Sequence, residues 1–600
     1  MFRFTIHNAA PAIMRYNLSI STPEPKRRTN TFAALKKLLL MLADERKSLI
    51  TALVAILINS ALMLLGPLLI GHTIDTYVQT GQYHGVLVFS GILLGMYLVA
   101  LVTSYLQTKL MGGVGQRVLF RLRNDIFNKL QDLPVAFFNE NKAGDLISRI
   151  NNDTDKLNQF FSQYLMQFVS SIFIMTGAGI FLLSINPALG AAALSPSLLL
   201  LIFTRIATPW VKKSNAVNLA STGNLSAEIQ ESLNNFKVVV AFNRRDYFRE
   251  RFDEVNGNNF STALKAGFAN NMFMPVYTFF SHIGQLIVLA FGIYLISTGH
   301  FTIGLLISFL TYISNFYNPL RQLAALWSNF QIALAGWDRI SLILSMESNL
   351  STAVSIPGPC DEAFVSFRNV SFGYPNGKEV LHRVNFELEQ GKTYAFVGPT
   401  GGGKTTTASL IARLYDPSRG LVLLNGMDLR SYTSAERASK IGFILQDPFL
   451  FTGTVRENIL YGNDTYTAFS HVQLIQVIRE SGLEELLGRF EEGLETKIQN
   501  SGESISLGQK QLIAFIRAVL RKPDVLILDE ATANIDTVTE QQLEAILQKL
   551  PDSTTRIIIA HRLNTIENAD EIFFISAMQI IRAGSMDNAV QLLMHDKHDS

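Results

Sequence analysis

Four long stretches of the chain contain no aspartate, glutamate, lysine or arginine, and this feature constrains the fold more than any other. The stretches are residues 48–74, 76–108, 157–204 and 266–320. A helix that crosses a lipid bilayer needs about 20 mostly apolar residues. Each of the first two stretches holds one such helix, and each of the other two holds two helices and a tight turn. The sequence therefore predicts a polytopic α-helical membrane domain rather than the buried core of a soluble protein.

The predicted domain has six transmembrane helices, and the distribution of positive charge orients them. We expect the helices near residues 48–73, 85–108, 160–184, 188–208, 270–297 and 302–325. The three loops near 74–84, 185–188 and 297–301 carry no lysine or arginine, whereas the chain before the first helix and the two inner segments are rich in both. Because basic loops stay on the cytoplasmic side, both termini of this multi-pass membrane protein are predicted to be cytoplasmic.

The two inner segments, 109–156 and 205–265, are polar but patterned like helices. We expect them to extend the spans into the cytoplasm as long stalks, each broken near its middle. The breaks fall at Leu133-Pro134 and around Asn234-Asn235. A short transverse helix is predicted at each break, where it is placed to contact a cytoplasmic partner.

The second part of the chain has a different composition. Residues 1–362 hold 48 of the 100 charged residues and residues 363–600 hold the other 52, so the second part resembles an ordinary globular domain. Its short β-branched runs alternate with helical segments, which predicts an α/β fold with a largely parallel sheet. The sequence thus predicts an N-terminal cytosolic extension (1–34), the transmembrane domain (35–345), a linker (346–362), the α/β domain (363–590) and a C-terminal tail (591–600).

Overall charge and cysteine content exclude two kinds of site. Lys plus Arg number 51 and Asp plus Glu number 49, for a net charge of +2. This balance excludes the broad basic face of a nucleic-acid binder, so we expect no nucleic acid among the partners. Cys360 is the only cysteine, which rules out an intramolecular disulfide and a multi-cysteine zinc site.

The sharpest motif is GPTGGGKT at residues 398–405, between a predicted strand at 393–397 and a helical run at 405–415. This is a P-loop in the structural context that it requires, and it predicts a P-loop ATPase domain. Its glycines let backbone N–H groups close around phosphates. Lys404 is expected to reach the β- and γ-phosphates of ATP, and the Thr405 hydroxyl to ligate Mg²⁺.

A second segment, DVLILDE at 524–530, is an apolar strand that ends in two carboxylates. Beside a P-loop, we expect Asp529 to lie near the metal, through a water, and Glu530 to polarise the attacking water as general base. His561 directly follows the strand 557–560, where a histidine can donate to a γ-phosphate. Taken by itself, His561 is more often a structural residue.

A third segment, SISLGQKQLIAFIRAVL at 504–520, predicts a helix that begins at about Leu507–Gly508 with Ser506 as its N-cap. A helix start with small residues is an anion site. Because the P-loop already supplies the phosphate position of this chain, the second anion site suggests a phosphate held by another subunit.

Taken in order, these motifs resemble those of a half-size ABC exporter, and the resemblance covers about residues 35–590. The family's fold is six transmembrane helices followed by one nucleotide-binding domain. Two chains close head to tail on two ATP molecules, and the closure moves short coupling helices, here near Ala136–Asn141 and Asn235–Ala241. Motifs in the membrane half, such as FFNENKAGDLISRINND at 137–153 and NPLRQL at 318–323, resemble the family as well.

The resemblance implies a role for each matching residue. It assigns the chain's own ATP to Tyr374, Gly398, Pro399, Thr400, Gly401, Gly402, Gly403, Lys404, Thr405, Thr406, Gln446 and Asp529. It assigns Mg²⁺ to Thr405, Gln446 and, through water, Asp529. It assigns catalysis to Glu530 and His561. It assigns the ATP of the partner's site to Ser506, Leu507, Gly508, Gln509 and Asp536.

One departure from the family pattern is informative. The segment ISLGQ at 505–509 resembles the family's signature motif, which is LSGGQ in most members. Leu507 stands where the signature has its first glycine, and Asn500 stands where the family usually has a glutamate. Both changes lie on the face that completes the partner's ATP site, whereas the residues that serve the chain's own site are intact. We therefore expect a heterodimer in which a second half-transporter is the partner; a homodimer that tolerates Leu507 is the alternative.

The resemblance implies ATP-driven export of hydrophobic or amphiphilic substrates, such as drugs, lipids or peptides, by alternating access across a membrane, here a bacterial plasma (inner) membrane. Membrane lipids are expected to contact the spans. An ATP-gated channel or regulatory subunit on the same fold is the alternative. Intact Glu530 and His561 favour turnover over gating. A soluble-type ATPase with a membrane anchor is disfavoured, because six spans exceed what an anchor requires.

The side chains of the predicted spans limit the substrate class. The neutral polar ones are Asn59, His72, His282, Gln285 and Asn315, and the aromatic ones include Phe273, Tyr277, Phe280, Phe309, Tyr312, Phe316 and Tyr317. A cavity of such groups suits apolar molecules or, through cation–π attraction, cationic amphiphiles. Packing between helices or against lipid explains each residue equally well.

Overall fold

The computed structural model describes residues 43–346, 363–374, 377–499, 505–529, 537–559 and 568–596. These residues form two compact units, which are treated separately below. The membrane unit contains the long helices, and the nucleotide unit contains the sheets together with the segment Lys129–Leu146. That segment belongs to the predicted transmembrane domain by sequence, but it packs with the second unit.

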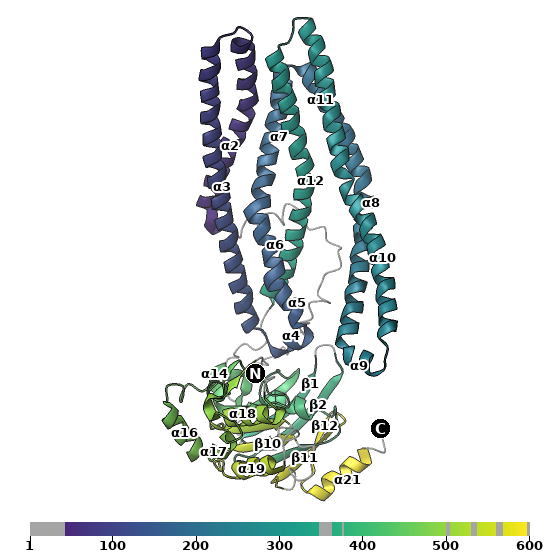
Figure 1. Ribbon diagram of the computed structural model, residues 1–600. Helices are drawn as coiled ribbons and strands as arrows, with labels where there is room; N and C mark the ends of the chain where they lie inside the picture. Colours follow the sequence, from purple (N-terminus) through teal and green to yellow (C-terminus); the bar gives the residue numbers. More distant parts are fainter. Residues whose placement is uncertain are drawn as a thin grey trace, which may run out of the picture. The chain divides into compact units, whose positions relative to one another are not determined.

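Long helices build the membrane unit (Figure 1). They are α2 (Arg46–Thr73), α3 (Tyr83–Gln131), α7 (Leu165–Ile185), α8 (Pro187–Asn234), α10 (Arg245–Asn271), α11 (Phe273–Ser297) and α12 (Ile303–Ser345). Short helical segments continue or connect these helices: η1 (Ala43–Glu45), η2 (Ile74–Val78), α5 (Ala143–Ser148), η3 (Arg149–Asp153), α6 (Thr154–Gln159) and η4 (Phe160–Tyr164). The 49 residues of α3 reach about 74 Å at 1.5 Å per residue, which confirms that the spans continue as long stalks.

Both predicted breaks in the inner segments are short helices. They are α4 (Val135–Glu140), which follows Pro134, and α9 (Phe236–Ala241), which follows Asn235. Pro134 begins α4 in extended backbone, since proline cannot continue a preceding helix but suits a helix start. The breaker residues therefore place both short helices correctly from sequence.

Among the described residues, five helical segments are long and apolar enough to cross a membrane. They are Ala43–Val78, Tyr83–Gln131, Ala143–Ile185, Pro187–Asn234 and Arg245–Ser297. The sixth predicted span, 302–325, falls on α12, a single helix of 43 residues. It is not among the five, because Asn315 and Asn318 make it more polar. Five of the six predicted spans are thus long and apolar enough to cross a membrane, and the sixth lies on a helix that is not among them.

Close packing of α2 against α12 holds part of the membrane unit together. Ser308 Oγ donates to the carbonyl of Pro67 at 2.7 Å, and the Tyr312 hydroxyl donates to the carbonyl of Leu64 at 2.5 Å. Near the C-terminal end of α2, Gly71 lies against Gly304 at the start of α12. A Cβ on Gly304 would lie 2.0 Å from the Gly71 carbonyl oxygen, so the two backbones can approach this closely only because residue 304 is glycine. Small residues allow such close approach of helices in membranes.

Replacing Gly304 with alanine is expected to destabilise the membrane unit by about 1–3 kcal/mol, because the added methyl group meets rigid backbone. The change would appear as a lower melting temperature of the detergent-solubilised chain. Gly91→Ala on α3 is the matched control, since nothing lies within 4 Å of its Cβ position. Equal melting temperatures for the two variants would contradict the α2–α12 contact.

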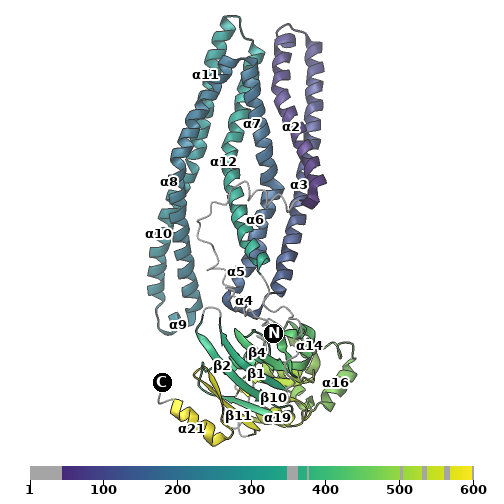
Figure 2. The same cartoon turned by 180° about the vertical axis from the view of Figure 1, so that it is seen from behind.

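Two main sheets form the nucleotide unit (Figure 2). The larger has the order β12-β11-β3-β10-β9-β6, and all its neighbours are parallel except β11 and β12. Its strands are β3 (Thr393–Val397), β6 (Ile441–Ile444), β9 (Val525–Asp529), β10 (Thr555–Ile559), β11 (Glu571–Ser576) and β12 (Gln579–Arg582). Every residue of β3 and β9 is buried, as expected for strands covered on both faces. The predicted α/β fold with a largely parallel sheet is confirmed.

The second sheet is antiparallel, with the order β2-β1-β4-β5, and the sequence did not predict it. Its strands are β1 (Val365–Gly373), β2 (Glu379–Leu388), β4 (Arg419–Leu424) and β5 (Met427–Asp428). A two-stranded sheet pairs β7 (Gly453–Thr454) with β8 (Lys497–Ile498). The helices of this unit are α13 (Lys404–Ile411), α14 (Ser434–Lys440), α15 (Val455–Ile459), α16 (His471–Glu480), α17 (Glu484–Leu487), α18 (Leu507–Val519), α19 (Thr537–Gln548) and α21 (Met586–Asp596).

Candidate functional site

The P-loop connects the end of β3 to the start of α13, as the motif predicts. Gly398 and Gly403 have φ values of 145° and 111°, a region that favours glycine. A Cβ on Gly398 would also lie 2.1 Å from the carbonyl oxygen of Ile575. Glycine is therefore required for the loop to turn tightly at the carboxyl end of the sheet and to present its N–H groups at the start of a helix.

Lys404 and Thr405 begin α13, and their side chains turn back toward the sheet edge. Lys404 is buried, and its Nζ donates to the carbonyl oxygens of Gly398 and Pro399 at 2.9 and 3.0 Å. The ammonium group is thus held over the centre of the loop. A phosphate in the loop would meet this charge at short range.

The metal-binding side of the site joins Thr405 to Asp529. Thr405 Oγ1 donates to Asp529 Oδ1 at 3.3 Å, and Asp529 is buried at the end of β9. The strand order accounts for the contact between Thr405 and Asp529. β10 lies between β3 and β9, and its residue Ile559 pairs with Phe396 of β3 on one side and with Asp529 of β9 on the other. A hydroxyl beside a buried carboxylate is an oxygen donor set that fits Mg²⁺.

Tyr374 lies beside the P-loop helix and keeps an exposed ring surface. Its hydroxyl is 3.1 Å from Thr406 Oγ1, and its ring meets the ring of Tyr415 edge-on at 5.3 Å. About a third of Tyr374 stays exposed, at 37%. A ring fixed at its hydroxyl end and open on its face has the form required to stack on a base.

Tyr415 also contacts α4, and neither partner of this contact stood out in the sequence. The Asn139 amide Nδ2 donates to the Tyr415 hydroxyl at 2.6 Å. Burial raises the pKa of Tyr415, so the phenol stays protonated. Because Tyr415 also meets the ring of Tyr374, one side chain links the short helix α4 to the base-stacking position. The two residues are 276 positions apart, so no local pattern could have revealed the pair.

The start of α18 is as predicted. Ser506 is the N-cap, and the Ser506 and Gln509 side chains form a capping box, in which each satisfies the other residue's backbone N–H. Gln509 Nε2 also donates to the carbonyl of Arg489 at 3.0 Å. Leu507 is 38% exposed in the first turn. Leu507, the residue that differs from the family pattern, therefore presents an apolar side chain to solvent at the helix start.

The remaining predicted residues fall into two groups. Gln446 is exposed just after β6, whose neighbour β9 ends in Asp529. Glu530, Asp536, His561 and Asn500 lie outside the described residues. Their assigned roles stay predictions from the sequence.

The structure corrects the aromatic cavity expected in the membrane unit. Tyr277, Phe309, Tyr312 and Tyr317 are buried in one hydrophobic cluster with residues such as Leu182. Their rings fill the space between helices, and the Tyr317 hydroxyl donates to the Ala193 carbonyl at 3.1 Å. Chemical character alone did not distinguish residues that pack between helices from residues that line a cavity.

Comparison with known proteins supports the motif analysis. The model of the ABC transporter transmembrane region matches residues 49–320, and the ABC transporter model matches residues 381–533. The chain is 32% identical to YfiC, an uncharacterised ABC transporter ATP-binding protein of Bacillus subtilis, over 94% of this chain and 93% of the relative. It is 34% identical to a fatty acid ABC transporter ATP-binding/permease protein of Mycobacterium bovis, over 82% and 77% of the two chains.

Two further comparisons extend this picture. An ATP-dependent lipid A-core flippase of Syntrophus aciditrophicus is 31% identical, over 82% of this chain and 81% of the relative. A solved bacterial Atm1-family ABC exporter with ATP bound superposes with a TM-score of 0.75 at 25% identity, over 92% and 96% of the two chains. The chain belongs to the ABC transporter family. Its fused membrane and ATP-binding domains make it a half-size exporter whose transport is coupled to ATP hydrolysis.

Proposed function

We propose that this chain is the catalytically complete half of a heterodimeric exporter in a bacterial plasma membrane. Its substrates would be hydrophobic or amphiphilic molecules, such as drugs, lipids or peptides. The relatives named for fatty acid and lipid A-core transport support a lipid-like substrate. The observation that supports the asymmetry is Leu507, which exposes an apolar side chain at the start of α18. On the chain's own side, Lys404 donates to a P-loop carbonyl and Thr405 donates to Asp529.

Hydrolysis follows from the placement of these groups. ATP would lie between the P-loop of this chain and the signature helix of the partner, with Lys404 neutralising charge on the β- and γ-phosphates. Glu530 would accept a proton from the water that attacks the γ-phosphorus, and the bond to the β,γ-bridging oxygen would break. Mg²⁺, when bound at Thr405, Gln446 and Asp529, would neutralise charge on the phosphate oxygens. His561 would donate to the γ-phosphate.

The second ATP site would be degenerate. There, α18 of this chain would close over the ATP of the partner, and Leu507 would place four side-chain carbons where a glycine allows close approach. Asn500 would lie on the same face. The partner's glutamate that corresponds to Glu530 is expected to be replaced, since that site would contribute little turnover.

Expression of the chain alone tests this proposal. We expect reconstituted chain to hydrolyse ATP slowly and to show no substrate stimulation until the partner half is added. The readout is phosphate release in liposomes, with a panel of drugs, lipids and peptides. Full, substrate-stimulated rates from the chain alone would establish a homodimer and overturn the heterodimer.

Coupling between ATP and the membrane helices would pass through Tyr415. Tyr415→Phe removes the hydrogen bond to Asn139 but keeps the ring beside Tyr374. We expect basal ATP hydrolysis to change less than about twofold, and substrate stimulation to fall severalfold, because a single neutral hydrogen bond contributes about 1 kcal/mol. Tyr461→Phe, at an exposed ring in the same unit, is the control. Unchanged stimulation in Tyr415→Phe would remove Tyr415 from the coupling route.

A further inference from the structure

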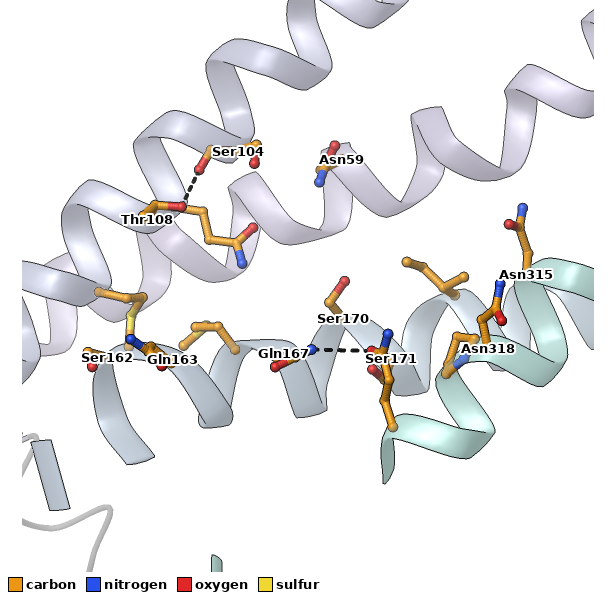
Figure 3. Close-up of a pocket in the computed structure, with 16 residues that line it drawn as sticks. Asn59, Ser104, Thr108, Ser162, Gln163, Gln167, Ser170, Ser171, Asn315 and Asn318 are labelled. Atoms are coloured by element: carbon orange, nitrogen blue, oxygen red, sulfur yellow. Dashed lines mark hydrogen bonds between the residues drawn. The ribbon is translucent and has the colours of Figure 1, made fainter. Parts of the chain in front are cut away.

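The membrane unit contains a cavity of about 420 Å³ whose lining differs from the rest of the spans (Figure 3). It lies among α2, α3, the η4–α7 segment and α12. Of its sixteen lining residues, seven have amide side chains and five have hydroxyl side chains. None of the sixteen is charged and none is aromatic. Neutral groups that both donate and accept hydrogen bonds therefore dominate the cavity.

Amide and hydroxyl side chains inside the membrane unit cost free energy when they are buried without hydrogen-bond partners. Asn59 lies in the middle of α2, and Asn315 lies within the predicted sixth span. Below the polar lining, Met111 and Met166 pack with Ala52 and Ile56 in a buried apolar cluster. Amides in such surroundings lose free energy when they lack partners, and polar residues inside a membrane usually serve a function.

Helix packing within this chain does not account for the lining. Among these sixteen described residues, one side-chain hydrogen bond joins two helices, from Gln167 Nε2 to Gln322 Oε1 at 3.3 Å. Thr108 bonds only to the carbonyl of Ser104 on its own helix. Asn59 Oδ1 is buried and has no hydrogen-bond partner among the described residues. A buried acceptor of this kind is satisfied by a donor from outside the protein.

The lining also discriminates against charge. A cation in the cavity would meet no carboxylate and no aromatic face, and an anion would meet no lysine or arginine. Either charge would be desolvated without an opposite charge in the lining to pair with. Hydroxyl or amide groups of a ligand, by contrast, would find both donors and acceptors on several helices.

We propose that this cavity binds the uncharged, hydrogen-bonding head group of an amphiphilic substrate, with hydroxyl or amide groups as the recognised chemistry. This inference rests on the proposed export function and narrows its substrate class. It replaces the preference for cationic amphiphiles that the aromatic residues suggested. The apolar tail would remain on the apolar surfaces of the neighbouring helices.

Four lipids that share one hexadecyl chain test the proposal. Their head groups are glucosyl, glycinamide, trimethylammonium and carboxylate, and native mass spectrometry of the detergent-solubilised full chain counts the lipid retained. We expect the glucosyl lipid, the glycinamide lipid or both to be retained at least about fivefold more than either charged lipid, from one or two neutral hydrogen bonds. The two neutral arms separate hydroxyl from amide recognition. Equal retention of all four lipids would overturn the proposal.

Two variants and a control sharpen the result. Asn315→Leu should lower retention of the preferred neutral lipid about fivefold. Thr311→Val removes a hydroxyl from the same helix α12, one turn away and outside the cavity lining, and should leave lipid retention unchanged.

Gln163→Glu places one negative charge in the cavity and should shift the preference to the trimethylammonium lipid. An unchanged preference in Gln163→Glu, with normal melting temperature, would show that lipids bind elsewhere.

Failure of this inference can be told apart from failure of the proposed function. Head-group selectivity is measured by binding, without ATP. If selectivity is absent while ATP-driven transport persists, the cavity assignment is wrong and the exporter stands. If selectivity is present while the assembled transporter moves no substrate with ATP, the exporter is wrong and the binding site stands.

Discussion

The Glu530→Gln chain is expected to hydrolyse ATP about 10²- to 10⁴-fold more slowly than the wild-type chain while it still binds ATP, because the loss of a general base has an effect of this size. Glutamine keeps the shape of glutamate but cannot accept the proton of the attacking water. The measurement is steady-state phosphate release beside equilibrium binding of a labelled ATP analogue, in the assembled transporter.

The geometry behind this expectation lies at the end of β9. Asp529 is buried there and contacts Thr405, and Glu530 is the next residue in the sequence. Glu480→Gln provides the control, since Glu480 is an exposed carboxylate at the end of α16. Wild-type hydrolysis by the Glu530→Gln chain would show that another group is the base.

The second large effect concerns the signature helix. Leu507→Gly is expected to raise ATP hydrolysis by the chain expressed alone about tenfold or more, because it restores close approach of the helix start to the γ-phosphate of a second copy. The capping box of Ser506 and Gln509 uses neither the Leu507 side chain nor its backbone N–H, so the helix start should be preserved. Glycine in the helix costs about 1 kcal/mol.

Val472→Gly is a closely matched control for this effect. Val472 is 77% exposed in the first turn of α16, whose capping box joins Ser470 and Gln473. An apolar side chain is therefore replaced by glycine in the first turn of another helix with a capping box. If Leu507→Gly and Val472→Gly give equal rates, Leu507 is not what limits hydrolysis by the chain alone.

Sequence patterns predicted the features that depend on neighbouring residues. Pro134 marked the start of α4, and Ser506 marked the start of α18 within one residue. The P-loop was placed correctly, because its glycines and flanking apolar runs are local signals. The antiparallel sheet that contains β1 was missed. One of its pairings, between β1 and β4, spans a long stretch of chain that includes the P-loop, although β1 and β2 pair as a local hairpin.

Contacts between distant residues account for what the sequence did not show. Asn139 and Tyr415 meet only in the folded nucleotide unit. The aromatic side chains of the spans gave no sign of which helix face they occupy, so the sequence left cavity lining and helix packing open for Tyr312 and Tyr317, which are buried between helices. The polar lining around Asn59 required four helices to come together, and single-helix patterns do not predict that.

Accumulation of substrate against a gradient tests the central claim, ATP-driven export, most directly. Inside-out vesicles that contain the assembled transporter would be supplied with a labelled amphiphile that stimulates its ATP hydrolysis. We expect the vesicles to concentrate the amphiphile above its outside level with ATP, and to fail to do so with Glu530→Gln. Flux that only equalises the two sides, and that persists with ATP bound to the Glu530→Gln chain, would contradict the account and identify an ATP-gated channel.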